Sequence, residues 1–188
     1  MKRCAVAVLG LALALSAHAF KGVDITGQGY GGDFRLVGHD GRPRSPADFA
    51  GKAVVMTFGF THCPDLCPTT LAGLAAMMRV LGADADRVQV LFVTVDPGRD
   101  TPAVLARYVT AFDARFLGLS GDAAATRRAA RGYHVFYQKV GGSFDHSAGS
   151  YVLDAKGRAR LFLRETLSAE DMAYDIRELL RDNGEASP

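Results

Sequence analysis

The sequence predicts an α/β protein in which helices cover both faces of a central mixed sheet. Two apolar runs, Ala53 to Phe60 and Val88 to Val95, have the composition of buried strands, and helical spacing of apolar residues follows each of them. The chain then ends with a hairpin pattern and an amphipathic helix. Alternating strands and helices of this kind pack as a layered α/β domain.

The first residues have the pattern of a targeting segment rather than of a folded element. Two basic residues precede an apolar run from Cys4 to Leu15, which is followed by Ser16-Ala17-His18-Ala19. This pattern predicts a signal peptide over residues 1–19 that is cleaved after export to the periplasm. The alternative is an uncleaved anchor facing the periplasm, but the fourteen residues from Cys4 to Ala17 are fewer than the ~20 that cross a bilayer.

The remaining residues, 20–188, are expected to form one domain. Cleavage removes two of the 22 basic residues and none of the 20 acidic ones, so the mature chain is close to neutral and carries no basic surface typical of nucleic-acid binding. A domain of this size buries a sufficient core without disulfides, and nothing requires more than a monomer.

The first half of this domain contains a hairpin, a strand and a helix. Phe34, Leu36 and the turn Asp40-Gly41 indicate an N-terminal hairpin extension that precedes the strand from Ala53. After Pro68 a helix is expected, ending at Gly82. Its apolar positions are Leu71, Leu74, Ala75, Met78 and Leu81.

The second half repeats the alternation. The strand from Val88 is stopped by Asp96-Pro97, and a helix from Thr101 or Pro102 to Phe112 should follow, with Asp100 or Thr101 as its cap. A capping box of Ser168 and Asp171 begins the last helix. The other expected elements are a helix over Ala123–Ala130, a short strand over Val135–Gln138, and a hairpin of Ser150–Leu153 with Arg160–Leu163.

The segment Phe60-Thr61-His62-Cys63-Pro64-Asp65-Leu66-Cys67-Pro68 carries the densest chemical signal, at the predicted strand-to-helix junction. A helix N-terminus favours thiolates, so we expect both cysteines to ionise more easily than a free thiol. Their spacing of four brings both sulfurs toward one point. Thiolates serve as nucleophiles in disulfide exchange and as ligands of soft metals such as Cu(I). A purely structural disulfide would close a very small loop and stabilise little.

Two sulfurs leave room for a third donor, and imidazole suits copper beside thiolate. His39 lies in a predicted turn and is expected to be solvated. His62 adjoins Cys63 and is expected to tune the site or to contact a partner, whereas His134 has the apolar neighbours of a partly buried, hydrogen-bonded histidine.

His146 is the leading candidate for the third donor. It lies in a small-residue loop, Gly141 to Ser147, just before the predicted hairpin. From position alone, a loop histidine bonded to Asp145 or Ser147 is an equally open interpretation.

Three charged residues follow the second strand: Asp96, Arg99 and Asp100. Such residues usually cap helices and form turns. The strand ending at Asp96 should neighbour the strand that precedes Cys63. We therefore expect these charged residues to lie at the same edge of the sheet as Cys63. A supporting role at the site or in partner docking is the alternative.

Several segments together resemble the Sco/SenC family of copper-binding proteins. They occur in the family's order and span most of the mature chain. The segments are Asp24-Ile25-Thr26-Gly27, Gly31-Gly32-Asp33-Phe34, Gly59 to Pro68, Val95-Asp96-Pro97-Gly98-Arg99-Asp100-Thr101-Pro102 and Asp145-His146-Ser147.

The resemblance implies a thioredoxin-like fold with copper, as Cu(I) or Cu(II), held by Cys63, Cys67 and His146. It also implies delivery of that copper to the binuclear centre of cytochrome c oxidase. The expected partners are the copper-centre subunit of the oxidase and other periplasmic copper chaperones or thiol reductants. Many family members keep an N-terminal membrane anchor, whereas this chain has the pattern of a cleavable signal.

Two other functions use the same sulfurs. A thiol-disulfide oxidoreductase would use Cys63 and Cys67 as catalytic residues to reduce the cysteines of the oxidase copper site, and a copper or redox sensor would have an identical site. Thioredoxin-like oxidoreductases carry a cis-proline opposite their cysteines, but no proline occurs between Pro102 and Pro188. The sequence therefore favours a metallochaperone over an enzyme.

Overall fold

The two apolar runs form adjacent parallel strands, β4 (Ala53–Gly59) and β5 (Val88–Thr94), in the computed structural model, which describes residues 19–141 and 143–185. Every residue of β4 is buried, as expected for a strand covered on both faces. Because the strands are parallel, both end at the same sheet edge, where the segments bearing Cys63 and Asp96 begin.

Around this pair the sheet is mixed, which confirms the predicted fold class. Its order is β1-β10-β9-β4-β5-β6-β2-β3, with β6 parallel to β5 and the remaining pairs antiparallel. The hairpin β2–β3 is the predicted N-terminal extension. The additional strands are β1 (Val23–Asp24), β2 (Leu36–Gly38), β3 (Pro43–Arg44), β6 (Leu117–Ser120), β9 (Ser150–Leu153) and β10 (Ala159–Leu163).

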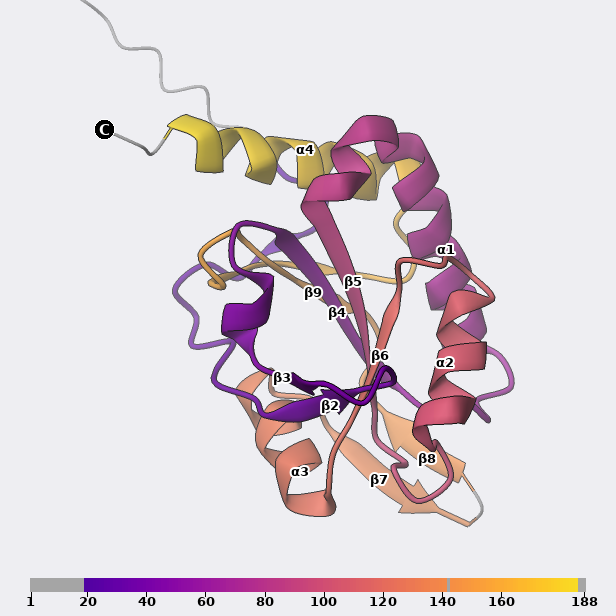
Figure 1. Cartoon of the computed structure of the whole chain (residues 1–188). Helices are drawn as coiled ribbons and strands as arrows, with labels where there is room; N and C mark the ends of the chain where they lie inside the picture. The colour runs from indigo at the N-terminus through magenta and orange to yellow at the C-terminus, as the bar shows by residue number, and fades with distance from the viewer. Residues whose placement is uncertain (1–18, 142, 186–188) are drawn as a thin grey trace, which may run out of the picture.

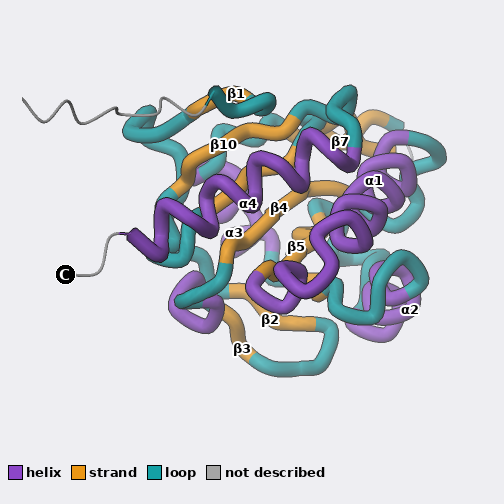
Figure 2. Tube along the Cα trace, turned by 90° about the horizontal axis from the view of Figure 1, so that it is seen from above, coloured by secondary structure: helices purple, strands orange, loops and turns teal. Residues whose placement is uncertain are grey.

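Helices cover both faces of the sheet (Figure 1). Helices α1 (Leu66–Leu81), α2 (Pro102–Thr110) and α4 (Ala169–Glu185) pack on one face, and α3 (Ala123–Gly132) packs on the other. Figure 2 shows α1 and α4 on the near side of the strands and α3 on the far side. Short 3-10 turns at Pro46–Phe49 and Gly82–Arg87 precede β4 and β5.

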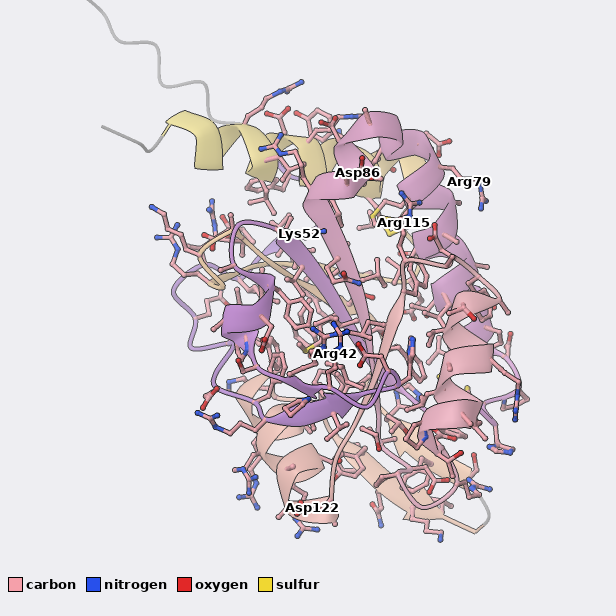
Figure 3. All side chains as sticks on the ribbon, in the orientation of Figure 1. Arg42, Lys52, Arg79, Asp86, Arg115 and Asp122 are labelled. Atoms are coloured by element: carbon pink, nitrogen blue, oxygen red, sulfur yellow. The ribbon has the colours of Figure 1, made fainter. Side chains whose placement is uncertain are left out.

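Side-chain caps fix where the helices begin. Thr101 Oγ1 caps α2, and Ser168 Oγ accepts a hydrogen bond of 3.0 Å from the Asp171 N–H at the start of α4, as predicted. Asp122, labelled in Figure 3 at the start of α3, accepts a backbone N–H bond of 2.7 Å. Lys52, labelled in the same view, lies just before the first residue of β4.

Some boundaries differ from those predicted. Helix α1 begins at Leu66 rather than after Pro68, because proline is compatible with the first helical turn. Helix α2 ends at Thr110 instead of Phe112. Strand β6 was not predicted, since its sequence Leu-Gly-Leu-Ser contains no β-branched or aromatic residue and its pairing with β5 and β2 defines the strand.

The largest difference lies between α3 and β9. The strand predicted over Val135–Gln138 is β7 (Tyr137–Val140), and the expected loop from Gly141 contains a further strand, β8 (Ser143–His146). These two strands pair only with each other within the described residues and form a separate two-stranded sheet.

Residues 1–18 of the predicted signal peptide lie outside the described part of the chain. Within it, the segment Leu66–Arg87 has the length and composition to cross a membrane. The apolar residues of α1 nevertheless form part of the buried core, for example Leu71 and Leu74. Core helices commonly share this composition.

The hairpin β9–β10 is closed by the buried carboxylate of Asp154. It accepts bonds of 3.0 Å from the backbone N–H groups of Lys156 and Arg158, and its second oxygen lies 2.8 Å from Arg158 Nε. Burial alone would raise the pKa of Asp154, but the bonds from Arg158 and Lys156 outweigh burial and hold the pKa below its ordinary value.

We predict that Asp154→Asn lowers the free energy of unfolding by about 2 kcal/mol at pH 7. The folded-state pKa of Asp154 lies below its unfolded value, so the stabilisation is present above about pH 4 and is lost as the pH falls through the folded-state pKa. Urea unfolding of wild type and variant at pH 7 and pH 3 should therefore show a difference that shrinks in acid. The exposed Asp33→Asn is the control, and a pH-independent difference would contradict the assignment.

Candidate metal centre

Cys63 lies in the turn between β4 and α1, where its backbone N–H donates to the Phe60 carbonyl at 3.2 Å. The N-cap residue of α1, Asp65, makes no side-chain cap bond. Instead the Cys67 N–H points to Cys63 Sγ at 3.4 Å, so this sulfur occupies the capping position at the helix N-terminus. Cys63 itself is outside the helix, and the turn, rather than helical spacing, brings the two sulfurs together.

The two thiols have opposite electrostatic environments. Partial burial opposes ionisation of Cys63, but N–H groups of Cys67, Asp65 and Leu66 outweigh it and lower the pKa of the Cys63 thiol below its ordinary value. Burial raises the pKa of Cys67 to about 12, and the nearby charges of Cys63 and Asp100 add to the shift. The expectation of two easily ionised thiols is therefore correct for Cys63 and wrong for Cys67.

Cys67 lies in the first turn of α1 and is only 4% exposed. Its sulfur lies directly over β4 at a residue without a side chain. A Cβ atom on Gly59 would meet Cys67 Sγ at 2.6 Å and the ring of Phe92 at 3.0 Å. Glycine at this strand position therefore creates the space in which the sulfur sits.

His146 is the last residue of β8 and is half-buried against Phe60, with ring centroids 5.9 Å apart. Its Nδ1 lies 2.9 Å from the carbonyl oxygen of Ser147. A carbonyl can only accept, so Nδ1 carries the proton and the lone pair of the neutral ring is on Nε2. That atom lies 3.6 Å from Cys67 Sγ. The loop interpretation and the ligand interpretation of His146 are thus compatible, because they use different ring nitrogens.

The structure brings Cys63, Cys67 and His146 into one cluster. Their three ligand atoms lie within 4.8 Å of one another, and both cysteines are free. A surface groove of about 470 Å³ between the start of α1 and strand β8 opens on Cys63 and His146. Two sulfurs and one imidazole nitrogen, with one open side, form a donor set suited to copper.

Asp100 stabilises the turn that carries Cys63 through hydrogen bonds. It is fully buried and accepts bonds from the Thr61 N–H at 3.0 Å and the Thr61 hydroxyl at 2.6 Å. The Thr94 hydroxyl donates to it at 2.5 Å. One carboxylate thus joins the end of β4 to the end of β5, and it fixes the turn that carries Cys63. Of the two residues predicted as possible caps of α2, Thr101 caps the helix and Asp100 does not.

The other charged candidates lie outside the cluster of ligand atoms. Asp96 is buried just after the end of β5 and forms an ion pair with the exposed Arg99. His62 is exposed, its Nδ1 lies 3.0 Å from Thr61 Oγ1 and 3.7 Å from Asp100 Oδ1, and it is not part of the group of clustered ligand atoms. Asp145 is exposed and, because side chains alternate along a strand, lies on the opposite face of β8 from His146.

The remaining described histidines lie outside the cluster. His39 is half-buried and its Nδ1 accepts the Gly118 N–H at 3.0 Å, so it is not a fully solvated turn residue. His134 is exposed rather than partly buried, and it packs edge-on against Tyr30 with a backbone φ of 54°.

Sequence reasoning missed Gly59, Thr61 and Thr94 as contributors to the site. A signal existed for the first, since a glycine at the end of an otherwise apolar strand often marks a close approach. The two threonines gave none, because threonine is ordinary both in a strand, as Thr94 is, and in a turn, as Thr61 is, and only the position of Asp100 reveals their role.

We predict that alkylation with iodoacetamide at pH 7 modifies Cys63 before Cys67. Cys67 has a pKa of about 12 and Cys63 one below 9.0, so Cys67 has roughly a thousandfold less thiolate. Peptide mapping by mass spectrometry should give at least a tenfold faster rate at Cys63. In urea the two rates should converge, and faster modification of Cys67 in the folded chain would refute the assignment.

We further predict that Gly59→Ala displaces Cys67 Sγ and weakens Cu(I) retention roughly tenfold, at a cost in stability of about 1–3 kcal/mol from overpacking. Gly73→Ala is the matched control, because its Cβ would lie 3.7 Å from Met172 Cε in ordinary contact. Competition titration and urea unfolding measure the two effects. Unchanged copper retention in Gly59→Ala would show that the sulfur position does not depend on this glycine.

The SCO1/SenC family matches residues 23–181 of this chain. The mitochondrial Protein SCO2 homolog of Mus musculus is 43% identical over 154 residues, which cover 78% of this chain and 60% of that protein. The SCO2-like protein of Rickettsia felis is 35% identical over 160 residues, covering 81% and 76%. The chain spans 58–60% of the length of the mammalian relatives.

Solved structures of Sco proteins have the same fold as this chain. Bradyrhizobium japonicum ScoI with copper bound superposes with a TM-score of 0.76 at 36% identity, covering 80% of this chain and 99% of that one. Yeast Sco1 with copper bound gives 0.75 at 28% identity, covering 85% and 95%. Homologous structures therefore contain copper, and this chain presents a Cys-Cys-His group suited to the same metal. With a family match over most of its length and a thioredoxin-like fold, this protein belongs to the SCO1/SenC family.

Proposed function

We propose that this protein is a periplasmic copper metallochaperone that holds one copper ion through Cys63, Cys67 and His146. Its partner would be the copper-centre subunit of cytochrome c oxidase, to which it delivers the ion. The observation that carries the proposal is the convergence of three ligand atoms within 4.8 Å at a groove open to solvent.

The unequal thiols suggest an order of binding. Cys63 is the more exposed and more easily ionised sulfur, so it captures the ion first. Cys67 then loses its proton to solvent as the second Cu–S bond forms, since bound metal replaces the proton as the charge partner of the sulfur. His146 supplies Nε2 without losing a proton, because its Nδ1–H remains bonded to the Ser147 carbonyl.

Delivery requires that another protein's donors replace these ligands one at a time. The groove leaves Cys63 and His146 accessible, whereas Cys67 lies behind them. We infer that an incoming thiolate or imidazole displaces the accessible pair before Cys67. The exposed side chains of His62, Asp145 and Arg99 are suited to contact the partner.

A second function, thiol-disulfide exchange, is favoured by one observation. An easily ionised, accessible Cys63 beside a buried Cys67 matches the division between an attacking and a resolving thiol. In that reaction the Cys63 thiolate attacks a partner disulfide, and Cys67 then releases the reduced partner as the Cys63–Cys67 disulfide forms. His146 has no role in these steps.

Copper titration of the reduced chain tests the proposal. We predict one Cu(I) per wild-type chain, and a loss of at least about a hundredfold in affinity in Cys63→Ser and Cys67→Ser, beyond the effect typical of outer contacts. His146→Ala should weaken Cu(II) binding more than Cu(I) binding, because Cu(II) prefers imidazole nitrogen more strongly. His134→Ala, an exposed histidine away from the cluster, is the control.

Equal affinities in all variants would exclude the three-ligand site. If no copper is retained but Cys63 and Cys67 reduce a partner disulfide regardless of residue 146, the exchange function is the better assignment.

A further inference from the structure

Asp175 is a buried carboxylate that holds the beginning of the folded chain. It lies in α4 and is fully buried. Its Oδ1 accepts the Lys21 N–H at 2.8 Å, and its Oδ2 accepts the Gly22 N–H at 2.7 Å. These donors lie 154 and 153 residues away in sequence. One side chain therefore attaches the segment that precedes β1 to the last helix.

The three residues from Phe20 to Gly22 are docked on the domain. Phe20 is partly buried against the apolar cluster that includes residues of α1 and α4. A Cβ atom on Gly22 would meet Leu163 Cδ2 at 2.9 Å and the Phe162 carbonyl oxygen at 3.1 Å, so a side chain at this position would clash with β10. The segment thus has a defined place in the fold that begins at Phe20.

The Asp175 carboxylate has hydrogen bonds but no nearby positive charge. Both donors are neutral backbone N–H groups, and within residues 19–141 and 143–185 it forms no ion pair. The Lys21 ammonium lies instead over the ring of Tyr174, 5.6 Å from its centroid. Burial raises the pKa of Asp175, the two N–H bonds offset that rise only in part, and the charge of Asp171 adds to it. A cation placed beside this carboxylate would stabilise its charged form.

Removal of the predicted signal peptide would create such a cation. The sequence Ala17-His18-Ala19 has the small-x-small pattern of a cleavage site, and Ala19 is exposed. Hydrolysis adds water across the Ala19–Phe20 peptide bond, which leaves a carboxylate on Ala19 and an amine on Phe20. That amine takes up a proton at neutral pH, since α-amino groups have an ordinary pKa of about 7.7–8.0. In the uncleaved chain the same nitrogen is a neutral amide.

Covalent geometry limits how far the new charge can lie from Asp175. Three bonds separate consecutive backbone nitrogens, which are therefore at most about 3.7 Å apart. Because Lys21 N lies 2.8 Å from Asp175 Oδ1, the Phe20 nitrogen lies within about 6.5 Å of that oxygen. At this separation, beside a buried group, opposite charges attract each other appreciably.

We propose that the Ala19–Phe20 bond is the processing site of this chain and that Asp175 binds the amino terminus that processing creates. The Phe20 ammonium supplies the positive charge that this carboxylate lacks, so cleavage stabilises the folded domain and fixes its first residue to α4. This inference concerns the amino terminus and does not depend on the metal centre.

Export of the full chain in a bacterial host tests the processing site, with the product analysed by intact mass and N-terminal sequencing. We expect the exported protein to begin at Phe20. A matched chain carries Gly-Ser inserted between Ala19 and Phe20, so that cleavage after Ala19 leaves the ammonium two residues further from Asp175. The residues from Phe20 onward are the same in both products.

Urea unfolding of the two products at pH 7 without copper tests the role of Asp175. We expect the chain that begins at Phe20 to have an unfolding equilibrium constant about tenfold smaller than that of the chain with the insertion. In Asp175→Asn the two chain starts should unfold alike, because the carboxylate that distinguishes them is absent.

A second comparison does not require Asp175→Asn to fold. The charged groups that act on Asp175, namely Asp171 and Lys21, are common to both products. An α-amine is largely neutral at about pH 10, so the difference between the two chain starts should be present at pH 7 and shrink as the pH is raised.

An exported protein that begins at another residue would overturn the processing site. Equal stability of the two chain starts at pH 7, or the same difference in Asp175→Asn, would overturn the role of Asp175, as would a difference that persists at pH 10. A processed chain that shows the expected stabilities but retains no copper would overturn the proposed function and leave this inference in place.

Discussion

The metal centre depends on one buried carboxylate, Asp100, which joins the ends of two parallel strands. Parallel pairing alone brings the segments after β4 and β5 to a common edge, but it does not fix their conformation. Asp100 does so by accepting a backbone N–H and a hydroxyl from Thr61 and a second hydroxyl from Thr94. The turn that follows Thr61 positions Cys63, so the capping sulfur is held indirectly by the neighbouring strand.

The contrast between the two cysteines follows from the same geometry. Cys63 Sγ lies at the N-terminus of α1, where backbone N–H groups favour negative charge. Four residues later, Cys67 is turned toward the sheet over Gly59, where burial opposes that charge. One helix start therefore holds a reactive thiol and a protected thiol side by side, which suits a site that must both take up and retain a soft metal ion.

Much of the fold and the three clustered residues could be predicted from sequence, because long apolar runs, helix caps and the cysteine motif are local signals. Strand β6 and strand β8 could not, since neither contains a β-branched residue and each is defined by its pairing with another strand. The high pKa of Cys67 could not be predicted from the sequence either, because it arises from burial in the folded core. His146 was the leading candidate from its position, and the family resemblance favoured it as a ligand, whereas its Nδ1 bond to Ser147 depends on backbone geometry that spacing does not reveal.

The separate two-stranded sheet has a mechanical consequence. Two of the clustered donors belong to the junction of the main sheet and α1, whereas His146 belongs to β7–β8, which pairs with no other strand in the described residues. The aromatic contacts of Phe60 with Phe144 and His146 are part of the packing between these units. An ion bound by all three donors would cross-link the two-stranded sheet to the main sheet. Its release would weaken the attachment of the two-stranded sheet and leave the main sheet unchanged.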